Sequence, residues 1–194
     1  DFRSDALGMA VPYGIYDVAI NRGAVFVGHS HDTADFAVDA IATWWRGEGR
    51  LSHRGATELL LLADNGGSNG SSHRAWRYHL QHKLADPFGL TVTVCHYPPG
   101  TSKWNPIEHR LFAEISKNWA GEPLTSYETM LNFIRTTTTA TGLTVSAQLL
   151  PGNYPTGIKI SEQQMKQLSI SSHEVCPKWN YTVYPRTEKC AVVS

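Results

Sequence analysis

The chain has 194 residues, of which 41% are hydrophobic, and its 17 Lys and Arg residues balance its 17 Asp and Glu residues. A chain of this size can bury a continuous core, which excludes disorder as its main state and favours one α/β domain. Its longest apolar run, residues 59–63, is far below the roughly 18 to 20 residues that span a bilayer, so we expect no association with a membrane.

The first residues of the chain and its cysteines indicate in which cellular compartment the protein is expected. Residues 1–5 lack both a starting Met and the charged-then-apolar pattern of a secretion signal, so we expect further polypeptide to precede them in the natural protein. The three cysteines include no Cys-x-x-Cys pair, which argues against a disulfide framework and a thiolate zinc site. We therefore expect a cytoplasmic protein.

The first predicted elements are a hairpin and a helix. Residues 13–20 are rich in β-branched and aromatic side chains, residues 21–23 favour a tight turn, and residues 24–28 resume the strand pattern. Apolar side chains at helical spacing between Phe36 and Trp45 predict that an amphipathic helix follows the hairpin.

Two strands, each followed by a helix, are predicted next. Residues 59–63 form an unbroken apolar run between Glu58 and Asp64, so the segment 58–64 ends in an acid, which is typical of a strand buried on both faces of a sheet. A Gly-rich loop leads to a predicted helix over residues 72–84 and a strand over residues 90–95. Asn105 then opens a helix that we expect to continue to Trp119.

The last third of the chain is less regular. It predicts a helix over residues 126–136, a strand over 143–149, a short helix over 161–168 and an edge strand over 179–184. We expect residues 1–185 to form the domain and residues 186–194 to be a tail.

Two acids stand where chemistry is expected. Asp64 ends a strand, and open α/β sheets bind ligands at the carboxyl ends of their strands. Glu108 lies in the first turn of the helix after the next strand, so the two carboxylates converge if those strands are neighbours. Convergent carboxylates are ligands for Mg²⁺ or Mn²⁺, and a pair of such ions can hold the attacking and leaving oxygens of a phosphodiester displacement.

Each of these acids also has a purely structural interpretation. Asn105, Pro106 and Glu108 form a capping-box pattern, in which the acid serves only the helix backbone. Asp64 precedes Asn-Gly, and Asp is a common turn-forming residue in such a position. The positions of Asp64 and Glu108 in the sequence do not by themselves decide whether these acids have a structural or a catalytic role.

Residues 71–110 carry an excess of positive charge within a neutral chain. Five Lys and Arg residues stand against two acids, with five His and several aromatic residues interleaved. Cationic and flat side chains that alternate in one stretch suit a phosphate backbone and its bases, although a solvated helix face gives the same pattern.

The amino-acid sequence around the two acids resembles that of the DDE transposases of bacterial insertion sequences, and in particular that of the Rhodopirellula-type transposase family. The resemblance covers residues 11–185. It is carried by Leu-Leu-Ala-Asp-Asn-Gly-Gly-Ser-Asn-Gly at 61–70, by the stretch at 95–112 that contains Asn-Pro-Ile-Glu, and by Trp-Asn-Tyr-Thr-Val-Tyr-Pro at 179–185.

The resemblance implies an α/β fold of the ribonuclease H-like type, a mixed sheet flanked by helices. In that fold three antiparallel strands precede the first helix, and the opening strand bears the first catalytic Asp. Only two strands are predicted here, so we expect the first strand and its Asp to lie upstream of residue 1, with Asp17 as the less favoured alternative. Asp64 and Glu108 would be the second and third catalytic, metal-binding acids.

The resemblance further implies a transposase that cuts and joins DNA at insertion-sequence ends with two Mg²⁺ or Mn²⁺ ions. Its partners would be the terminal repeats and the target DNA, and the full-length protein would be a homo-oligomer. With one carboxylate missing, we expect this chain alone to be inactive. The residues expected to bind DNA are Lys103, Trp104, Arg110, Arg74 and Arg77.

Two other functions remain open at this point. His29, His31 and Asp32 follow a strand and have the His-x-His pattern of zinc-dependent hydrolases, although the chain is too short for a barrel hydrolase. A non-catalytic module that only binds DNA is the second alternative.

Overall fold

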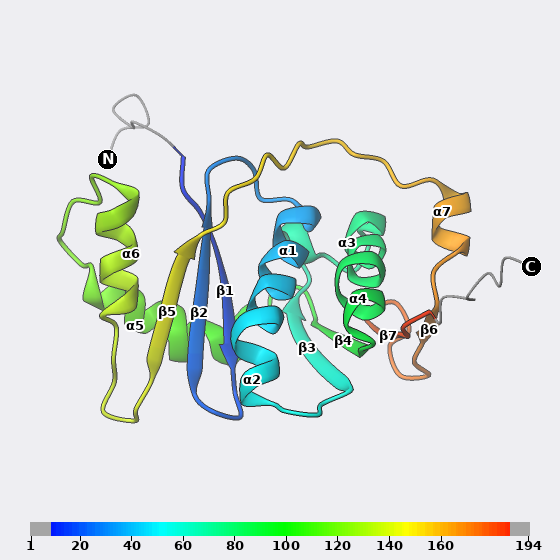
Figure 1. Cartoon of the computed structure of the whole chain (residues 1–194), viewed down its shortest axis with the longest axis horizontal. Coiled ribbons are helices and arrows are strands. Elements are labelled where there is room, and N and C mark those ends of the chain that lie inside the picture. Colours follow the sequence, from blue (N-terminus) through cyan, green and yellow to red (C-terminus); the bar gives the residue numbers. More distant parts are fainter. Residues whose placement is uncertain (1–8, 187–194) are drawn as a thin grey trace, which may run out of the picture.

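The computed structural model describes residues 9–186 (Figure 1). The predicted hairpin forms strands β1 and β2, and helix α1 follows it, with Thr33 as the residue that caps its N-terminus. The strands are β1 (Val11–Asp17), β2 (Arg22–Gly28), β3 (Glu58–Asp64), β4 (Thr91–Tyr97), β5 (Thr144–Leu149), β6 (Ile170–Ser172) and β7 (Asn180–Val183).

Most helices match their predicted positions, and three of them contain a π-helical turn. The α-helices are α1 (Ala34–Trp44), α2 (Arg50–Ser52), α3 (Arg74–His79), α4 (Asp86–Phe88), α5 (Ala113–Asn118), α6 (Tyr127–Arg135) and α7 (Glu162–Lys166). The π-helical turns are η2 (Trp45–Gly49), η4 (Leu80–Ala85) and η6 (Glu108–Phe112), and two short 3₁₀ turns are η3 (Gly67–Asn69) and η5 (Ser102–Trp104). None of the helices described combines the length and the apolar character that crossing a bilayer would need.

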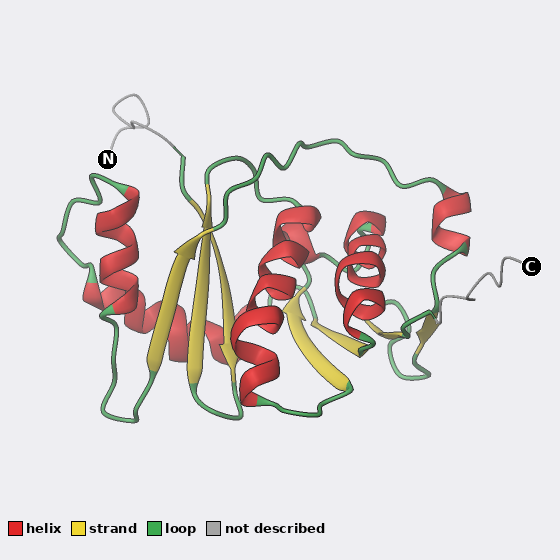
Figure 2. Cartoon of the chain, in the orientation of Figure 1, coloured by secondary structure: helices red, strands yellow, loops and turns green. Residues whose placement is uncertain are grey.

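The strands form two mixed sheets rather than one. The first has the order β1-β2-β5, with β1 antiparallel and β5 parallel to β2. The second has the order β3-β4-β7-β6, with β3 parallel to β4. Figure 2 shows helices flanking both sheets. The α/β class and the mixed sheets are therefore confirmed, and the arrangement is consistent with a ribonuclease H-like fold.

Period-two alternation along β2 builds two cores. Ala24 and Phe26 face the core formed with α1, α3 and η4, whereas Val25 and Val27 face the opposite core beneath α5 and α6. Leu111 and Ile115 fill that second core and are at most 2% exposed. The helix that begins beside Glu108 is thus fixed to the first sheet by its apolar face.

Two predictions about strand burial were wrong. β3 is not buried on both faces: Leu59 and Leu61 pack against the core with α1, while Leu60 and Leu62 on the other face are 59% and 45% exposed. β3 is also the edge strand of its sheet. The segment at 179–184 is not an edge strand either, since β7 lies between β4 and β6. β6 is too short and polar to stand out in the sequence.

Arg186, the first residue of the predicted tail, contacts the domain. The Arg186 guanidinium bonds the Asp86 carboxylate at 2.5 and 3.0 Å, and Gln81 donates to the same carboxylate. Burial raises the pKa of Asp86, but the bonds from Arg186 and Gln81 outweigh it and leave that pKa below its usual value. Arg186 therefore belongs to the folded domain, and the rest of the predicted tail lies outside the described residues.

Candidate active site

Asp64 lies at the carboxyl end of the edge strand β3. In the parallel pair formed with β4, Ala63 stands opposite His96 and Asp64 opposite Tyr97. The two strands that precede the candidate acids are therefore neighbours, as their predicted convergence requires. The Asp64 carboxylate raises the pKa of the Tyr97 hydroxyl, in addition to a larger effect of burial.

Glu108 opens the π-helical turn η6. Pro106 at the first helical position and Asn105 before it start the helix, and the backbone N–H of Glu108 donates to the Asn105 carbonyl oxygen at 3.1 Å. Half of the predicted capping box is present, since the Asn105 side-chain oxygen accepts from the Ile107 N–H at 3.4 Å. The other half is not, because the Glu108 carboxylate has no hydrogen-bond or ion-pair partner among the described residues.

Asn105 joins the two elements that carry the acids. Its side chain is buried, and its Nδ2 donates to Asp64 Oδ1 at 3.0 Å. The same amide therefore caps the Glu108 helix through its oxygen and holds the Asp64 carboxylate through its nitrogen. The sequence pointed to Asn105 only as a cap, although the amide of an Asn cap also carries an N–H₂ donor that the cap leaves free.

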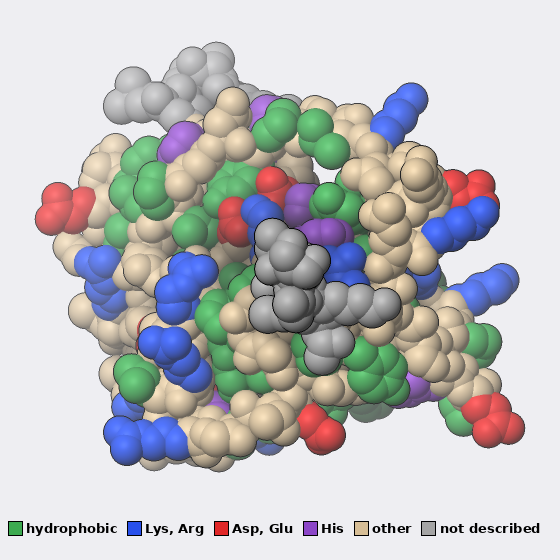
Figure 3. Space-filling view, turned by 45° about the vertical axis from the view of Figure 1, so that its right-hand side comes forward, with side chains coloured by type: hydrophobic (Ala, Val, Ile, Leu, Met, Phe, Trp, Pro, Cys, Tyr) green, Lys and Arg blue, Asp and Glu red, His purple; other side chains and the backbone are tan. Residues whose placement is uncertain are grey.

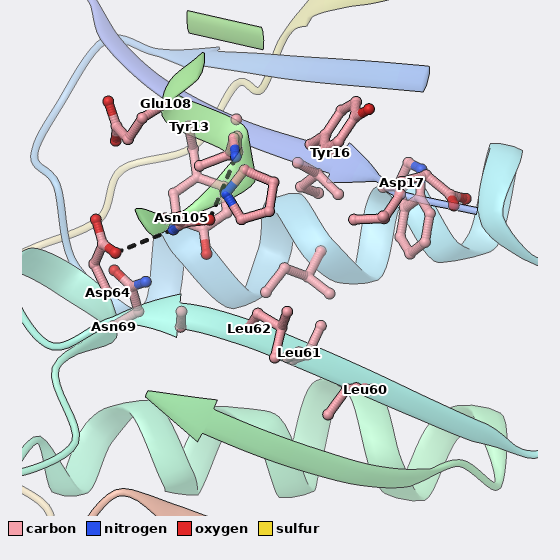
Figure 4. A pocket seen from close by; sticks show the side chains of 18 of the residues that line it. Tyr13, Tyr16, Asp17, Leu60, Leu61, Leu62, Asp64, Asn69, Asn105 and Glu108 are labelled. Atoms are coloured by element: carbon pink, nitrogen blue, oxygen red, sulfur yellow. Dashed lines mark hydrogen bonds between the residues drawn. The ribbon is translucent and has the colours of Figure 1, made fainter. Parts of the chain in front are cut away.

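Both acids line one cleft of about 960 Å³. Figure 4 shows Asp64 and Glu108 at the same end of this cleft, with Asn105 beside them and Asn69 from the following loop nearby. Asn65, next in sequence to Asp64, does not serve the cleft with its side-chain oxygen, which accepts from Ser71 at 2.7 and 3.0 Å. The loop after β3 is thus held by hydrogen bonds between its own residues Asn65 and Ser71. The Asp64 carboxylate remains at the rim of the cleft.

His96 supports this rim from inside the protein. It is 5% exposed, its Nδ1 donates to the Asp64 carbonyl oxygen at 3.4 Å, and the Tyr181 hydroxyl donates to its Nε2 at 3.3 Å. Burial, helped by the nearby Arg77 charge, lowers the pKa of His96. A neutral imidazole with one donor and one acceptor nitrogen satisfies both contacts. His96 therefore has a structural role beneath the site.

Asp17 lies at the other end of the cleft. Its side chain is 7% exposed and accepts a hydrogen bond from His53 Nε2 at 2.6 Å. Figure 4 places it far along β1 from Asp64 and Glu108. This geometry matches the interpretation of Asp17 as a paired structural acid.

Asp32, which the sequence placed in a candidate zinc site, instead lines the rim of the cleft. Its negative charge adds to the burial that raises the pKa of Tyr13, whose ring lies in the same cleft. His29 and His31 are exposed. Within residues 9–186, no three His, Cys, Asp or Glu side chains are arranged to hold a metal ion.

The predicted DNA-binding side chains fall into two groups, neither of which lines the cleft. Lys103, Trp104 and Arg110 are exposed beside the start of the Glu108 helix, and His109 bonds the Lys103 carbonyl oxygen. Arg77 instead stacks on the Tyr181 ring, 4.6 Å from its centre, and Arg74 reaches the Ile160 carbonyl oxygen. On the side of the molecule shown in Figure 3, basic and acidic side chains are interspersed, so that side carries no uniformly positive surface.

The chemistry of the two acids suits a divalent cation, but the two carboxylates are not a complete set of ligands for one. Asp64 and Glu108 offer hard carboxylate oxygens at one rim, and the Glu108 carboxylate is free of competing partners within the described residues. One Asp64 oxygen is occupied by Asn105. Two carboxylates can hold such an ion weakly, and a third ligand is needed for a tight site.

Comparison with known proteins identifies one relationship. A family model described as the Rhodopirellula transposase DDE domain matches residues 1–185. No curated protein and no solved structure matches the chain.

Proposed function

The chain belongs to the family of Rhodopirellula transposase DDE domains, and from this premise we propose that Asp64 and Glu108 are two of its catalytic, metal-binding carboxylates. The observation that supports the assignment is their position at one end of one cleft, linked through Asn105. The expected third carboxylate, on a strand outside residues 9–186, would complete the set.

The proposed reaction is cleavage and transfer of DNA strands at insertion-sequence ends. Mg²⁺ or Mn²⁺, when bound by such carboxylates, lowers the pKa of water and stabilises charge on the scissile phosphate. Asp64 and Glu108 would hold the cations, and Asn105 would keep the Asp64 carboxylate in place. Lys103, Trp104 and Arg110 would hold DNA beside the Glu108 helix through phosphate contacts and stacking on a base.

We further propose that residues 1–194 alone neither cut nor join DNA. Within the described residues the cleft lacks a group of three metal ligands, and a two-metal mechanism needs more donors than two carboxylates supply. The chain would still bind DNA, because Lys103, Trp104 and Arg110 are exposed independently of the acids.

Titration with Mn²⁺ alone tests the metal assignment. Residues 1–194 should bind Mn²⁺ weakly, and D64N and E108Q should each reduce the affinity by about tenfold or more, as loss of a ligand does. E162Q is the matched control, because Glu162 is an acid on α7 that is 72% exposed and does not line the cleft. Equal affinity in all four proteins would refute the metal site.

A nicking assay on insertion-sequence ends tests the proposed inactivity. Metal-dependent nicking by residues 1–194 that disappears in D64A would show that the cleft is complete without a third acid. DNA binding that needs no metal and is unchanged in D64N and E108Q, together with unchanged Mn²⁺ affinity, would instead favour the non-catalytic DNA-binding module.

A further inference from the structure

Three Asn side chains line the cleft, and the fold uses two of them. Asn105 donates to Asp64 Oδ1 at 3.0 Å, and the side-chain oxygen of Asn65 accepts from Ser71. The side-chain amide of Asn69 has no hydrogen-bond partner within residues 9–186. Because an amide carries two N–H donors and an acceptor oxygen, Asn69 can offer all of these groups to a molecule in the cleft.

The loop that carries Asn69 has a defined shape. Asn69 is the last residue of the 3₁₀ turn η3, which begins at Gly67 with a φ of +59°, a value that favours glycine. Ser68 and Ser71, on either side of Asn69, are 5% and 7% exposed. The bonds between Asn65 and Ser71 join the two ends of the loop around this turn. The Gly-rich segment therefore holds Asn69 at the cleft.

Asn69 lies at the end of the cleft where the two acids meet. Figure 4 shows its amide beside Asp64, at the end to which Glu108 also belongs. No Lys or Arg among the described residues lines the cleft. The acids that line it are Asp17, Asp32, Glu58, Asp64 and Glu108. A phosphate group bound at this end would therefore meet carboxylates and neutral polar groups, without a basic side chain.

A neutral donor suits this surrounding. Cations held by the carboxylates neutralise part of the charge of a phosphate, but its other oxygens still need hydrogen-bond donors. A Lys at position 69 would pair with the carboxylates and compete with the cations. The Asn69 amide can donate to a phosphate oxygen without such competition.

We propose that Asn69 is a substrate-contact residue, whose side-chain N–H₂ group donates a hydrogen bond to an oxygen of the DNA phosphate held at Asp64 and Glu108. The contact rests on the proposed function, since the cations of the two acids bring that phosphate to the cleft. A hydrogen bond to a charged acceptor is stronger than one between neutral groups, so one donor contributes measurably to DNA affinity. Because every nucleotide carries a phosphate, the contact is independent of DNA sequence.

Titration of a short duplex DNA of mixed sequence, in the presence of Mn²⁺, tests the contact on residues 1–194. N69A should weaken DNA binding by about tenfold, the effect of one hydrogen bond to a charged group. The Mn²⁺ affinity and the melting temperature should not change, because the amide binds neither the cation nor another described part of the protein. The salt dependence of log K should also stay the same, since a neutral donor releases no counterion.

N153A is the matched control for this substitution. Asn153 is an exposed loop residue that does not line the cleft, so N153A should bind DNA like the wild type. The same substitution at two exposed or half-buried loop positions thus differs only in whether the amide faces the cleft.

N69D separates contact with phosphate from binding of the cation. It places a negatively charged acceptor where the donor lies, in a side chain of nearly the same size. N69D should weaken DNA binding more than N69A does, while its Mn²⁺ affinity should equal or exceed that of the wild type, because a carboxylate is a good ligand for the cation. N153D controls for the added charge and should keep most of the DNA affinity.

Several outcomes would overturn the proposal. Equal DNA affinity in N69A and N153A would show that Asn69 does not contact DNA. A fall in the Mn²⁺ affinity of N69A as large as that of D64N would make Asn69 a cation ligand instead. An equal loss of DNA affinity with and without Mn²⁺ would separate Asn69 from the phosphate at the acids. Failure of the proposed function is read from a different result, equal Mn²⁺ affinity in the wild type, D64N and E108Q.

Discussion

Asn105 is bonded to Asp64 across the cleft, with 3.0 Å between its side-chain nitrogen and the nearer carboxylate oxygen. The same side chain caps the helix that Glu108 opens. One amide therefore sets both the position of the Asp64 carboxylate and the start of the Glu108 helix. The capping function and the carboxylate contact use different atoms, so substitutions can separate them.

N105S should retain the cap and lose the contact with Asp64. Ser is a good N-cap but is too short to replace the amide nitrogen, so the free energy of unfolding should fall by less than about 1 kcal/mol, while N105A should cost about 0.5 to 2 kcal/mol. Both variants should change Mn²⁺ affinity, measured by titration, to a similar extent. If N105S binds Mn²⁺ like the wild type, Asn105 acts only as a cap.

DNA affinity should depend on the exposed pair Lys103 and Trp104. Trp104 is 68% exposed and Lys103 Nζ lies 5.4 Å from its ring centre. W104A should reduce single-stranded DNA affinity by about fivefold or more, as the loss of one stacked base does, without a change in melting temperature.

K103A should weaken binding to all DNA sequences and reduce the salt dependence of log K by about one unit. K166A is the control, because Lys166 is 76% exposed on α7 and pairs with Glu162 on the same helix. Fluorescence titrations at several salt concentrations measure both quantities. Equal slopes for K103A and K166A would place the DNA elsewhere.

G14A should destabilise the contact between β1 and the Glu108 helix. A Cβ at Gly14 would lie 2.5 Å from the Phe112 ring, so Phe112 must shift, at a cost of about 1 to 3 kcal/mol. A Cβ at Gly47 would have no neighbour within 4 Å, so G47A should be neutral or slightly stabilising. Urea unfolding of the two variants measures the difference, and equal midpoints would contradict the close packing of β1 on Phe112.

Stability should fall as the pH is lowered through the range in which His96 titrates. Burial lowers the pKa of His96 below its ordinary 6.5, so the unfolded chain binds the proton first. The stabilisation is full above about 6.5 and is lost as the pH falls towards the pKa of the folded state. Burial lowers the pKa of His79 in the same direction, despite the nearby Asp35.

H96Q should reduce this acid sensitivity and should not abolish it, because His79 remains. The measurement is the free energy of unfolding between pH 7.5 and 5, obtained from urea titrations at each pH. A wild-type stability that is constant over this range would show that folding does not lower the pKa of either histidine.

The sequence by itself determined the order of the elements around the site. Apolar periodicity located the hairpin, α1, β3, β4 and the helix that starts after Asn105, since burial of one face leaves a regular pattern along the chain. It also marked Asp64 and Glu108, because an acid at the end of an apolar strand and an acid beside a helix start are local features.

Only the tertiary structure decided how these elements meet. The bond between Asn105 and Asp64, the burial of His96 beneath the rim and the pairing of Asp17 with His53 join residues far apart in sequence, so no local pattern records them. The partition into two sheets was likewise invisible, because an apolar run such as β3 reads the same whether both of its edges are paired or one is open. Strand pairing is a relation between distant segments, so the open edges that β1 and β3 have among residues 9–186 could be seen only once those segments were placed in space.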